Sequence, residues 1–377
     1  MKKLRILVAC LLLFCLCTTA LADSSNGVWS YRINDGKATL TAYEGAQVVT
    51  RLEFPAEVEG CPVTVIGDGS MLFLWLNEIG QHTELVFPES TEVIAGGFFS
   101  LGYFDDVVIP ANVKTIGDYA FNVSTISSVT FNGAPETFGE FAFSEAFTLE
   151  SIAIPEGTVS LGVSCFELCD SLTTASLPST LEELGQKCFS GCVNLSEVTF
   201  AEGSRITSIP IACFLSTAIK SIEIPEGVTT IGSNAFYNCT KLTSVTLPQS
   251  LTLIASDAFS NCTANPTFTV VEDSFAHEWV EQKGFKMKVV PAPIILPEGA
   301  EDAYRELSPG CEGDDVFAAR MKMYELGFFA NVPTQRDYTK TMMDYVKKFE
   351  RAYGLEEDGI LSPHDQAILF YVTPDEE

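Results

Sequence analysis

The sequence predicts a β-rich solenoid with a parallel sheet, followed by a small all-α domain of three helices. Two observations predict the solenoid: a strand pattern that returns every 22 to 24 residues, and a phenylalanine that returns in phase with it. The loss of this period after residue 290 predicts a separate domain. Such a period is typical of repeat proteins, in which a unit buries its apolar side only by stacking on its neighbours.

A short alternating strand opens each repeat. In most repeats proline follows the strand and ends it, because proline cannot donate to a ladder. The last strand residues are Phe87, Ile109, Phe131, Ile154, Leu177, Phe200, Ile224 and Leu247. We expect these strands side by side in a parallel sheet, about 4.8 Å apart.

Two further columns mark the rest of each repeat. The phenylalanine column is Phe98, Phe121, Phe143, Phe166, Phe189, Phe214, Phe236 and Phe259. An apolar residue before glycine forms the other column, as in Ile116-Gly117 and Ile231-Gly232, where glycine suits a tight bend. Three features in register over eight repeats predict one continuous hydrophobic interior.

The repeat resembles a known bacterial family. Residues 224–242 read Ile-Pro-x-x-Val-x-x-Ile-Gly-x-x-Ala-Phe-x-x-Cys-x-x-Leu, which is similar to the BspA-like leucine-rich repeat. Residues 29–67 and 268–290 resemble the N-terminal and C-terminal caps of such domains. The resemblance implies a leucine-rich-repeat solenoid, with its caps, over residues 23–290.

Seven cysteines follow the repeat. They form two columns: Cys169, Cys192, Cys239 and Cys262, and Cys165, Cys188 and Cys213. No histidine recurs near them and alanine takes the second position in other repeats, so small buried residues explain them better than metal ligands do. Disulfides between adjacent repeats are the alternative. We therefore predict neither a metal site nor a cofactor.

Strand alternation predicts which side chains point away from the core. The candidate binding residues of this sheet face are Ser128, Thr130, Ser151, Thr174, Ser176, Glu197, Thr199, Ser221, Glu223, Ser244 and Thr246. They are small, hydroxylated or acidic, and the face lacks the tryptophan, tyrosine and arginine anchors of tight interfaces. For each individual residue, a solvated strand surface is the favoured explanation over binding. An adhesive role is what the family resemblance implies.

The C-terminal part has a different pattern. Proline and acidic residues in 291–306 predict a linker, and the helical domain covers 307–372. Caps and apolar spacing predict three helices: from Asp314 or Asp315 to about Leu326, from Thr339 to Tyr353, and from Pro363 to about Tyr371.

This domain resembles the three-helix peptidoglycan-binding domain. Matching positions include Gly310, Gly313, Leu326-Gly327-Phe328, Tyr338-Thr339, Phe349, Gly354-Leu355 and Asp358-Gly359-Ile360. Arg320 and Glu350 stand where the family has glutamine. The resemblance implies that a glycan or stem peptide docks near Tyr338, Phe349, Asp358 and Gly359. A purely structural role is an equal alternative for each of these residues.

The first 22 residues read as an export signal. Lys2, Lys3 and Arg5 precede an apolar run, and Ala20-Leu21-Ala22 gives a cleavage site. The run, residues 6–17, is too short to span a bilayer. A lipoprotein signal ending at Cys10 is the alternative, but too little apolar sequence precedes it. We expect a secreted, cell-wall-associated protein with no transmembrane segment after cleavage.

The charge excludes one class of partner. Cleavage leaves 19 basic against 50 acidic residues, a formal net charge of −31. Such a chain repels phosphate backbones, so nucleic acid is not an expected partner.

The sequence predicts no enzyme. The three histidines lie far apart, at positions 82, 277 and 364, and no nucleophile or metal motif is present. Carboxylates are plentiful, so composition alone leaves a paired-acid glycosidase open. We expect an adhesion or binding protein that attaches to peptidoglycan and binds an extracellular protein or glycan. The alternative is a scaffold subunit that brings another secreted wall enzyme to peptidoglycan.

Overall fold

The computed structural model describes residues 24–45, 49–69, 82–292, 296, 299–329 and 331–372. The predicted signal peptide, residues 1–22, lies outside the described residues. The chain divides into two compact units: Met1–Leu242 with Ile254–Ala264, and Thr243–Leu253 with Asn265–Glu377.

A small β-structure caps the first unit. It consists of β1 (Ser24–Ser25), β2 (Trp29–Asn34), β3 (Lys37–Tyr43), β4 (Arg51–Glu53), β5 (Glu57–Val58) and β6 (Cys61–Ile66). β2 and β3 form an antiparallel hairpin whose turn residues, Asp35 and Gly36, both have positive φ. β3 then pairs in parallel with β6, and this pairing begins the parallel order of the repeats.

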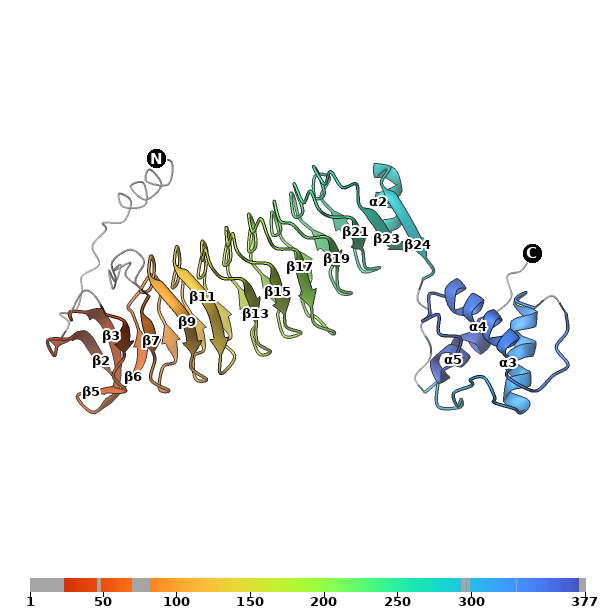
Figure 1. Cartoon of the computed structure of the whole chain (residues 1–377), viewed down its shortest axis with the longest axis horizontal. Coiled ribbons are helices and arrows are strands. Elements are labelled where there is room, and N and C mark those ends of the chain that lie inside the picture. Colours follow the sequence, from red (N-terminus) through yellow and green to blue (C-terminus); the bar gives the residue numbers. More distant parts are fainter. Residues whose placement is uncertain are drawn as a thin grey trace. The chain divides into compact units, whose positions relative to one another are not determined.

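The predicted parallel strands are present and lie on one side of the repeats (Figure 1). They are β7 (Glu84–Val86), β9 (Tyr103–Ile109), β11 (Thr125–Phe131), β13 (Ser151–Ala153), β15 (Thr174–Leu177), β17 (Glu197–Phe200) and β19 (Ser221–Glu223). Their register is one repeat per strand, as in the pairing of Thr174 with Glu197. The prediction of a solenoid with a parallel sheet, followed by helices, is confirmed.

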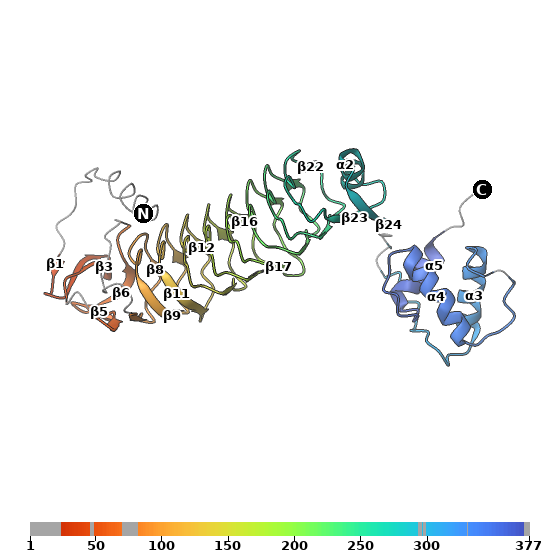
Figure 2. The same cartoon turned by 45° about the horizontal axis from the view of Figure 1, so that its top comes forward.

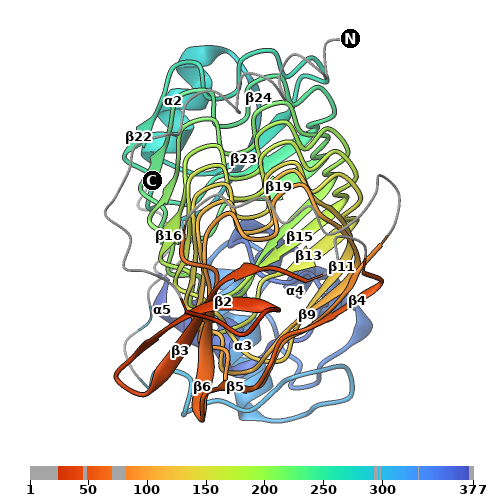
Figure 3. The same ribbon diagram turned by 90° about the vertical axis from the view of Figure 1, so that its left-hand side faces the viewer.

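A second set of parallel strands lies where the sequence predicted only a bend before glycine (Figure 2), with β8 to β16 in one sheet and β18, β20 and β22 in another. Its two-residue strands are β8 (Val93–Ile94), β10 (Thr115–Ile116), β12 (Thr137–Phe138), β14 (Ser160–Leu161), β16 (Glu183–Leu184), β18 (Ser208–Ile209), β20 (Thr230–Ile231) and β22 (Leu253–Ile254). Figure 3 shows β16 on the opposite side of the coil from β9, β11, β13 and β15. Each repeat is thus one rung with two strand-bearing sides.

The phenylalanine column forms the centre of the core. Successive rings from Phe99 to Phe259 have centroids 5.0 to 5.7 Å apart and planes within 18° of parallel. The first ring of this stack is Phe99, which corrects the prediction of Phe98. Phe98 packs edge-on against Phe99 at 77°, because the two neighbouring side chains leave the backbone in different directions.

The third side of each rung has an unusual backbone. Around Phe166, both Ser164 and Leu168 have positive φ, 55° and 58°. The N–H groups of Ser164, Phe166 and Leu168 each donate to a carbonyl of the next rung, at 2.8 Å. The alternation of left-handed and right-handed residues therefore turns the N–H group of every second residue toward the next rung.

The second unit begins with the last strands. β21 (Ser244–Thr246), β23 (Thr267–Val271) and β24 (Lys286–Val290) pair in parallel. Between the last two lies α2 (Phe275–Lys283), which was not predicted from the sequence. Its buried residues, Ala276, Trp279 and Val280, have the spacing of one helical face. Ser274 caps its start, and Gly284 ends it with a φ of 69°.

Three further helices follow, close to the predicted bounds: α3 (Asp314–Glu325), α4 (Lys340–Ala352) and α5 (Pro363–Tyr371). Thr339 caps α4, and Ser362 and Asp365 form a capping box on α5. The predicted aspartate cap of α3 is wrong, because Gly313 holds the cap position without a side-chain bond. Asp315 instead accepts a 2.7 Å hydrogen bond from Arg305 Nε. The helices enclose a small core that includes Leu307, Val316, Met323, Met342, Val346, Phe349 and Leu361.

Candidate functional site

The predicted sheet face points to solvent. Thr130, Ser151, Ser176, Glu197, Thr199, Ser221, Glu223 and Ser244 are exposed, whereas Ser128, Thr174 and Thr246 are half-buried. The residues between them, such as Ile152, Val198 and Ile222, are buried. The alternation that was predicted for these strands is therefore present. A role of these residues in binding stays a prediction.

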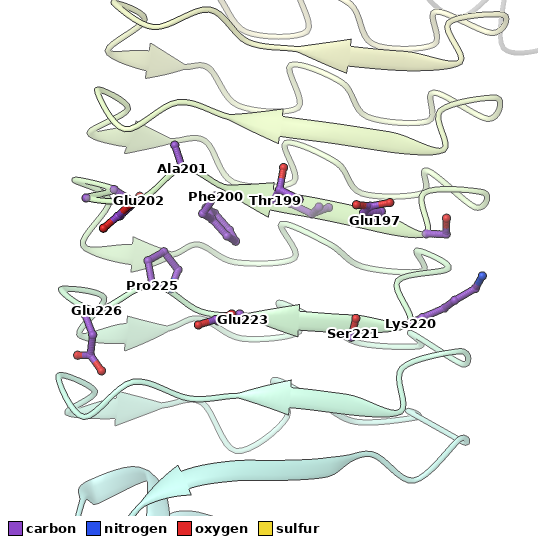
Figure 4. Close-up of a pocket in the computed structure, with 14 residues that line it drawn as sticks. Glu197, Thr199, Phe200, Ala201, Glu202, Lys220, Ser221, Glu223, Pro225 and Glu226 are labelled. Atoms are coloured by element: carbon purple, nitrogen blue, oxygen red, sulfur yellow. The ribbon is translucent and has the colours of Figure 1, made fainter. Parts of the chain in front are cut away.

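Four of the predicted residues meet in a depression between β17 and β19 (Figure 4). These are Glu197, Thr199, Ser221 and Glu223, and the depression has a volume of about 740 Å³. Its other lining side chains include Phe200, Ala201, Glu202, Ser204, Lys220, Pro225 and Glu226. All of these residues belong to the first unit.

The depression lies at one of the interruptions of this sheet, which is also interrupted between β7 and β9 and between β11 and β13. β17 ends the three-stranded sheet β13–β15–β17, and β19 belongs to a different sheet. The two strands start together, because Lys220 N–H donates to Ser196 O at 3.3 Å. The step from Phe200 to Ile224, the corresponding position of the next repeat, is 24 residues instead of 22 or 23. The extra residues follow Phe200 and place the segment 201–204 along the border of the depression.

The depression is acidic and partly apolar. Four carboxylates (Glu197, Glu202, Glu223 and Glu226) line it, together with one ammonium group, that of Lys220. The Phe200 ring is only half-buried, whereas Ile154, Leu177 and Ile224 are buried at the same position of other repeats. Thr199 Oγ1 donates to Ser176 Oγ at 3.2 Å and thereby links the depression to the preceding strand, β15. This arrangement suits contact with a polar, cationic surface.

Sequence reasoning missed the apolar and additional acidic residues of the depression. Glu202, Pro225 and Glu226 lie beyond the strand ends, where alternation makes no prediction about orientation, and Phe200 ends β17 at a position that alternation places inward. Two signals mark the place in the sequence: the step of 24 residues, and alanine instead of proline after Phe200.

The cysteine columns lie in the core. Cys165, Cys188, Cys192 and Cys213 are buried, and burial raises the pKa of each of these thiols. Cys192 Sγ donates to the carbonyl of Phe166 at 3.0 Å. All nine cysteines of the described residues are unpaired thiols. Among these residues, no group of three or more His, Cys, Asp or Glu side chains has the geometry to hold a metal ion.

The helical domain, residues 307–372, is called the helical module below. Its four predicted residues lie in different surroundings. Tyr338 and Phe349 are buried, and Tyr338 OH donates to Gly359 O at 2.8 Å. Gly359 is buried with a φ of 78°, so it forms the turn itself. Asp358 is exposed. The predicted docking near these residues thus depends on Asp358 and the surface around it, and stays a prediction.

A buried carboxyl group holds the same turn. Glu350 is fully buried, and both of its oxygens accept from Gly359 N–H, at 3.1 and 3.0 Å. Burial, and to a lesser extent the charges of Asp358 and Asp365, raise the pKa of Glu350 to about 7. This glutamate stands at one of the positions where the sequence departs from the peptidoglycan-binding family.

The family of the repeats is established by comparison. The family described as BspA type Leucine rich repeat region matches residues 91–209 and 207–276, in six copies. The repeat region is a BspA type leucine-rich repeat. No curated protein sequence matches the chain. No helix of the described residues has both the length and the apolar character needed to cross a membrane.

Several solved structures are similar to the BspA type repeat region. A leucine rich cell surface protein of Faecalibacterium prausnitzii A2-165 is 21% identical, with 69% of this chain and 97% of that chain covered and a TM-score of 0.33. A leucine-rich repeat protein of Bacteroides ovatus ATCC 8483 is 17% identical, with 71% of this chain and 100% of that chain covered and a TM-score of 0.33. The pneumococcal vaccine antigen PcpA is 16% identical, with 66% of this chain and 64% of that chain covered and a TM-score of 0.34.

Proposed function

We propose that this chain is a non-enzymatic binding protein of the bacterial cell surface, exported and associated with the cell wall. The helical module attaches it to peptidoglycan, and the sheet face of the BspA type repeats binds protein or glycan partners. The observation that carries the binding role is that the same two strand positions face outward, exposed or half-buried, from rung to rung along that face.

This surface supports binding rather than catalysis. Catalysis needs a nucleophile or base that converges with its partners at one point. The face instead offers hydroxyl and carboxylate groups spread over several rungs, such as Ser151, Ser176 and Glu223. Repeat proteins use extended surfaces of this kind to contact macromolecules.

Sedimentation with purified sacculi tests the wall attachment. We expect the mature chain, residues 23–377, to pellet with sacculi. A chain that ends at residue 292 keeps the repeats and serves as the control, and it should stay in the supernatant. Equal sedimentation of both chains, or of neither, would contradict the proposed role of the helical module.

A further inference from the structure

We propose that the depression between β17 and β19 receives an extended peptide segment of a partner protein that carries lysine or arginine side chains. The inference rests on the proposed function, because it names the kind of partner that the sheet face takes. It also fixes the place of binding on that face.

The edges of β17 and β19 that border the depression do not pair with each other. Ala201 N–H donates to Leu177 O, so the backbone groups of Val198 and Phe200 face β19 by alternation. Beyond the bond from Lys220 to Ser196, no backbone hydrogen bond between the described residues of β17 and β19 closes this gap. Strand edges of this kind accept an added extended segment through main-chain hydrogen bonds.

Both strands contribute acidic side chains to the depression. Glu197 and Glu223 are exposed on neighbouring strands, and Glu202 is exposed at the border. Figure 4 shows Glu197 and Glu223 on the two neighbouring strands and Glu202 at the turn that follows β17. Opposite charges across an interface raise the association rate and select the partner. A segment with basic side chains is therefore favoured, and an acidic one is repelled.

The depression also has an apolar border. The half-buried ring of Phe200 lies near Pro225 at the end of the depression where the strands have separated. Lysine and arginine lay their methylene stems on apolar surface while their charged ends stay in water. An arginine also gains from stacking on an aromatic face. The depression thus offers a basic side chain both a stem contact and a charge contact.

Other occupants fit less well. A neutral glycan is less favoured, because the lining residues include neither tryptophan nor tyrosine, whose rings combine apolar area with a polar group. A nucleic acid is repelled by the four carboxylates. A basic protein segment is the occupant that uses the strand edges, the charges and the ring together.

A peptide-binding experiment on the mature chain tests the inference. The probe is a fluorescein-labelled peptide of five Lys-Thr repeats, and a peptide of five Glu-Thr repeats is the charge control. The test variant combines Glu197→Gln and Glu223→Gln. The matched variant combines Glu150→Gln and Glu183→Gln, which change two exposed glutamates outside the depression and alter the net charge equally.

We expect the test variant to raise the Kd for the basic peptide at least ten-fold and the matched variant to raise it less than two-fold. Hydrogen exchange on the unmodified protein should show slower exchange at Ile222 and Ile224 when the peptide is bound. Equal losses in both variants would mean diffuse attraction and would overturn the inference. Protection that maps to another rung, or a preference for a neutral glycan, would overturn it too. None of these outcomes bears on sacculus sedimentation, so the two proposals fail separately.

Discussion

The repeat region and the helical module make their turns in different ways. In the repeats, left-handed backbone recurs at non-glycine residues such as Ser164, Leu168, Lys187 and Ala212. In the described part of the module, every residue with positive φ is a glycine: Gly310, Gly313, Gly327, Gly354 and Gly359. Left-handed backbone is costly for side chains larger than glycine. The hydrogen bonds from rung to rung therefore outweigh residue preference in the repeats, whereas the module relies on glycine.

The two regions also differ in what they bury. The repeat interior consists of stacked phenylalanines, aliphatic side chains and thiols. The module encloses two charged side chains, Arg320 and Glu350, in a much smaller core. Arg320 Nη1 donates to Asp337 O, and Glu350 accepts from Gly359 N–H. The module is therefore expected to be the more pH-sensitive region, and the repeats the more sensitive to loss of apolar volume.

Loss of a central ring should have the largest effect. Phe189→Ala removes a fully buried ring that stacks at 5.4 and 5.7 Å on its two neighbours. We expect it to lower the free energy of unfolding of the repeats by about 3–5 kcal/mol, because the stacked backbone cannot collapse into the cavity. Urea denaturation followed by far-UV circular dichroism measures this. Cys188→Ala is the control, since Ala142 and Ala235 occupy that column in other rungs, and it should cost about 1 kcal/mol. Equal losses would show that the ring stack is not the main source of stability.

The buried glutamate should make the module's stability depend on pH. The pKa of Glu350 is about 7 in the folded chain, whereas a glutamate in an unperturbed setting has a pKa of 4.5. The folded state therefore holds the proton more tightly, and this stabilisation is complete below pH 4.5 and is lost as the pH rises through 7. The free energy of unfolding of the module is therefore expected to be about 3 kcal/mol lower above pH 7 than below pH 4.5. Thermal unfolding of the module between pH 4.5 and 8.5, followed by tyrosine fluorescence, measures it.

Glu350→Gln should abolish most of that pH dependence, because the amide keeps an acceptor for Gly359 N–H and carries no charge. Glu356→Gln, at an exposed position of the same module, is the matched control and should leave the dependence intact. A Glu350→Gln profile as steep as that of the unchanged chain would assign the dependence to another group.

Thiol reactivity should separate the two regions. A hydrogen bond from the backbone N–H of Ser308, together with the guanidinium of Arg305, lowers the pKa of Cys311. In the repeats, burial instead raises the pKa of Cys188 and Cys213. A disulfide reagent at pH 8 should modify Cys311 at least ten-fold faster than any repeat cysteine, since the thiolate is the reactive form. Peptide mapping by mass spectrometry after timed quenching identifies the site. Early modification of Cys188 would mean that the rungs open readily.

The smallest effect should come from relaxing one left-handed residue. Leu168 has a φ of 58° and is exposed, while the equivalent position of the next rung is Gly191. Leu168→Gly should stabilise the repeats by no more than about 1 kcal/mol, the scale of a left-handed residue's strain. The corresponding change in the module, Gly354→Leu, should destabilise by a similar amount. Urea midpoints of both variants compare the two regions directly, and a destabilising Leu168→Gly would show that the backbone there carries no strain.

The periodic features were the most predictable part of this protein. The strand positions, the ring column and the outward residues of each strand follow from spacing alone, because every rung repeats the same environment. The single misplaced ring, Phe98, falls where two phenylalanines stand next to each other and spacing cannot choose between them. In the candidate site, alternation correctly oriented Glu197 and Glu223. It placed Phe200 inward but did not reveal that the ring is only half-buried, and it gave no information about Pro225 beyond the strand end.

The sequence by itself determined the repeat length, the residues of the core columns and the positions of the three C-terminal helices, since each depends on local periodicity and caps. The tertiary structure decided three other matters. These are the second set of parallel strands, the left-handed residues on the third side, and the opening between β17 and β19. Each depends on the hydrogen bonds that one rung makes with the next, and a chain has no such partner until its neighbours have stacked on it.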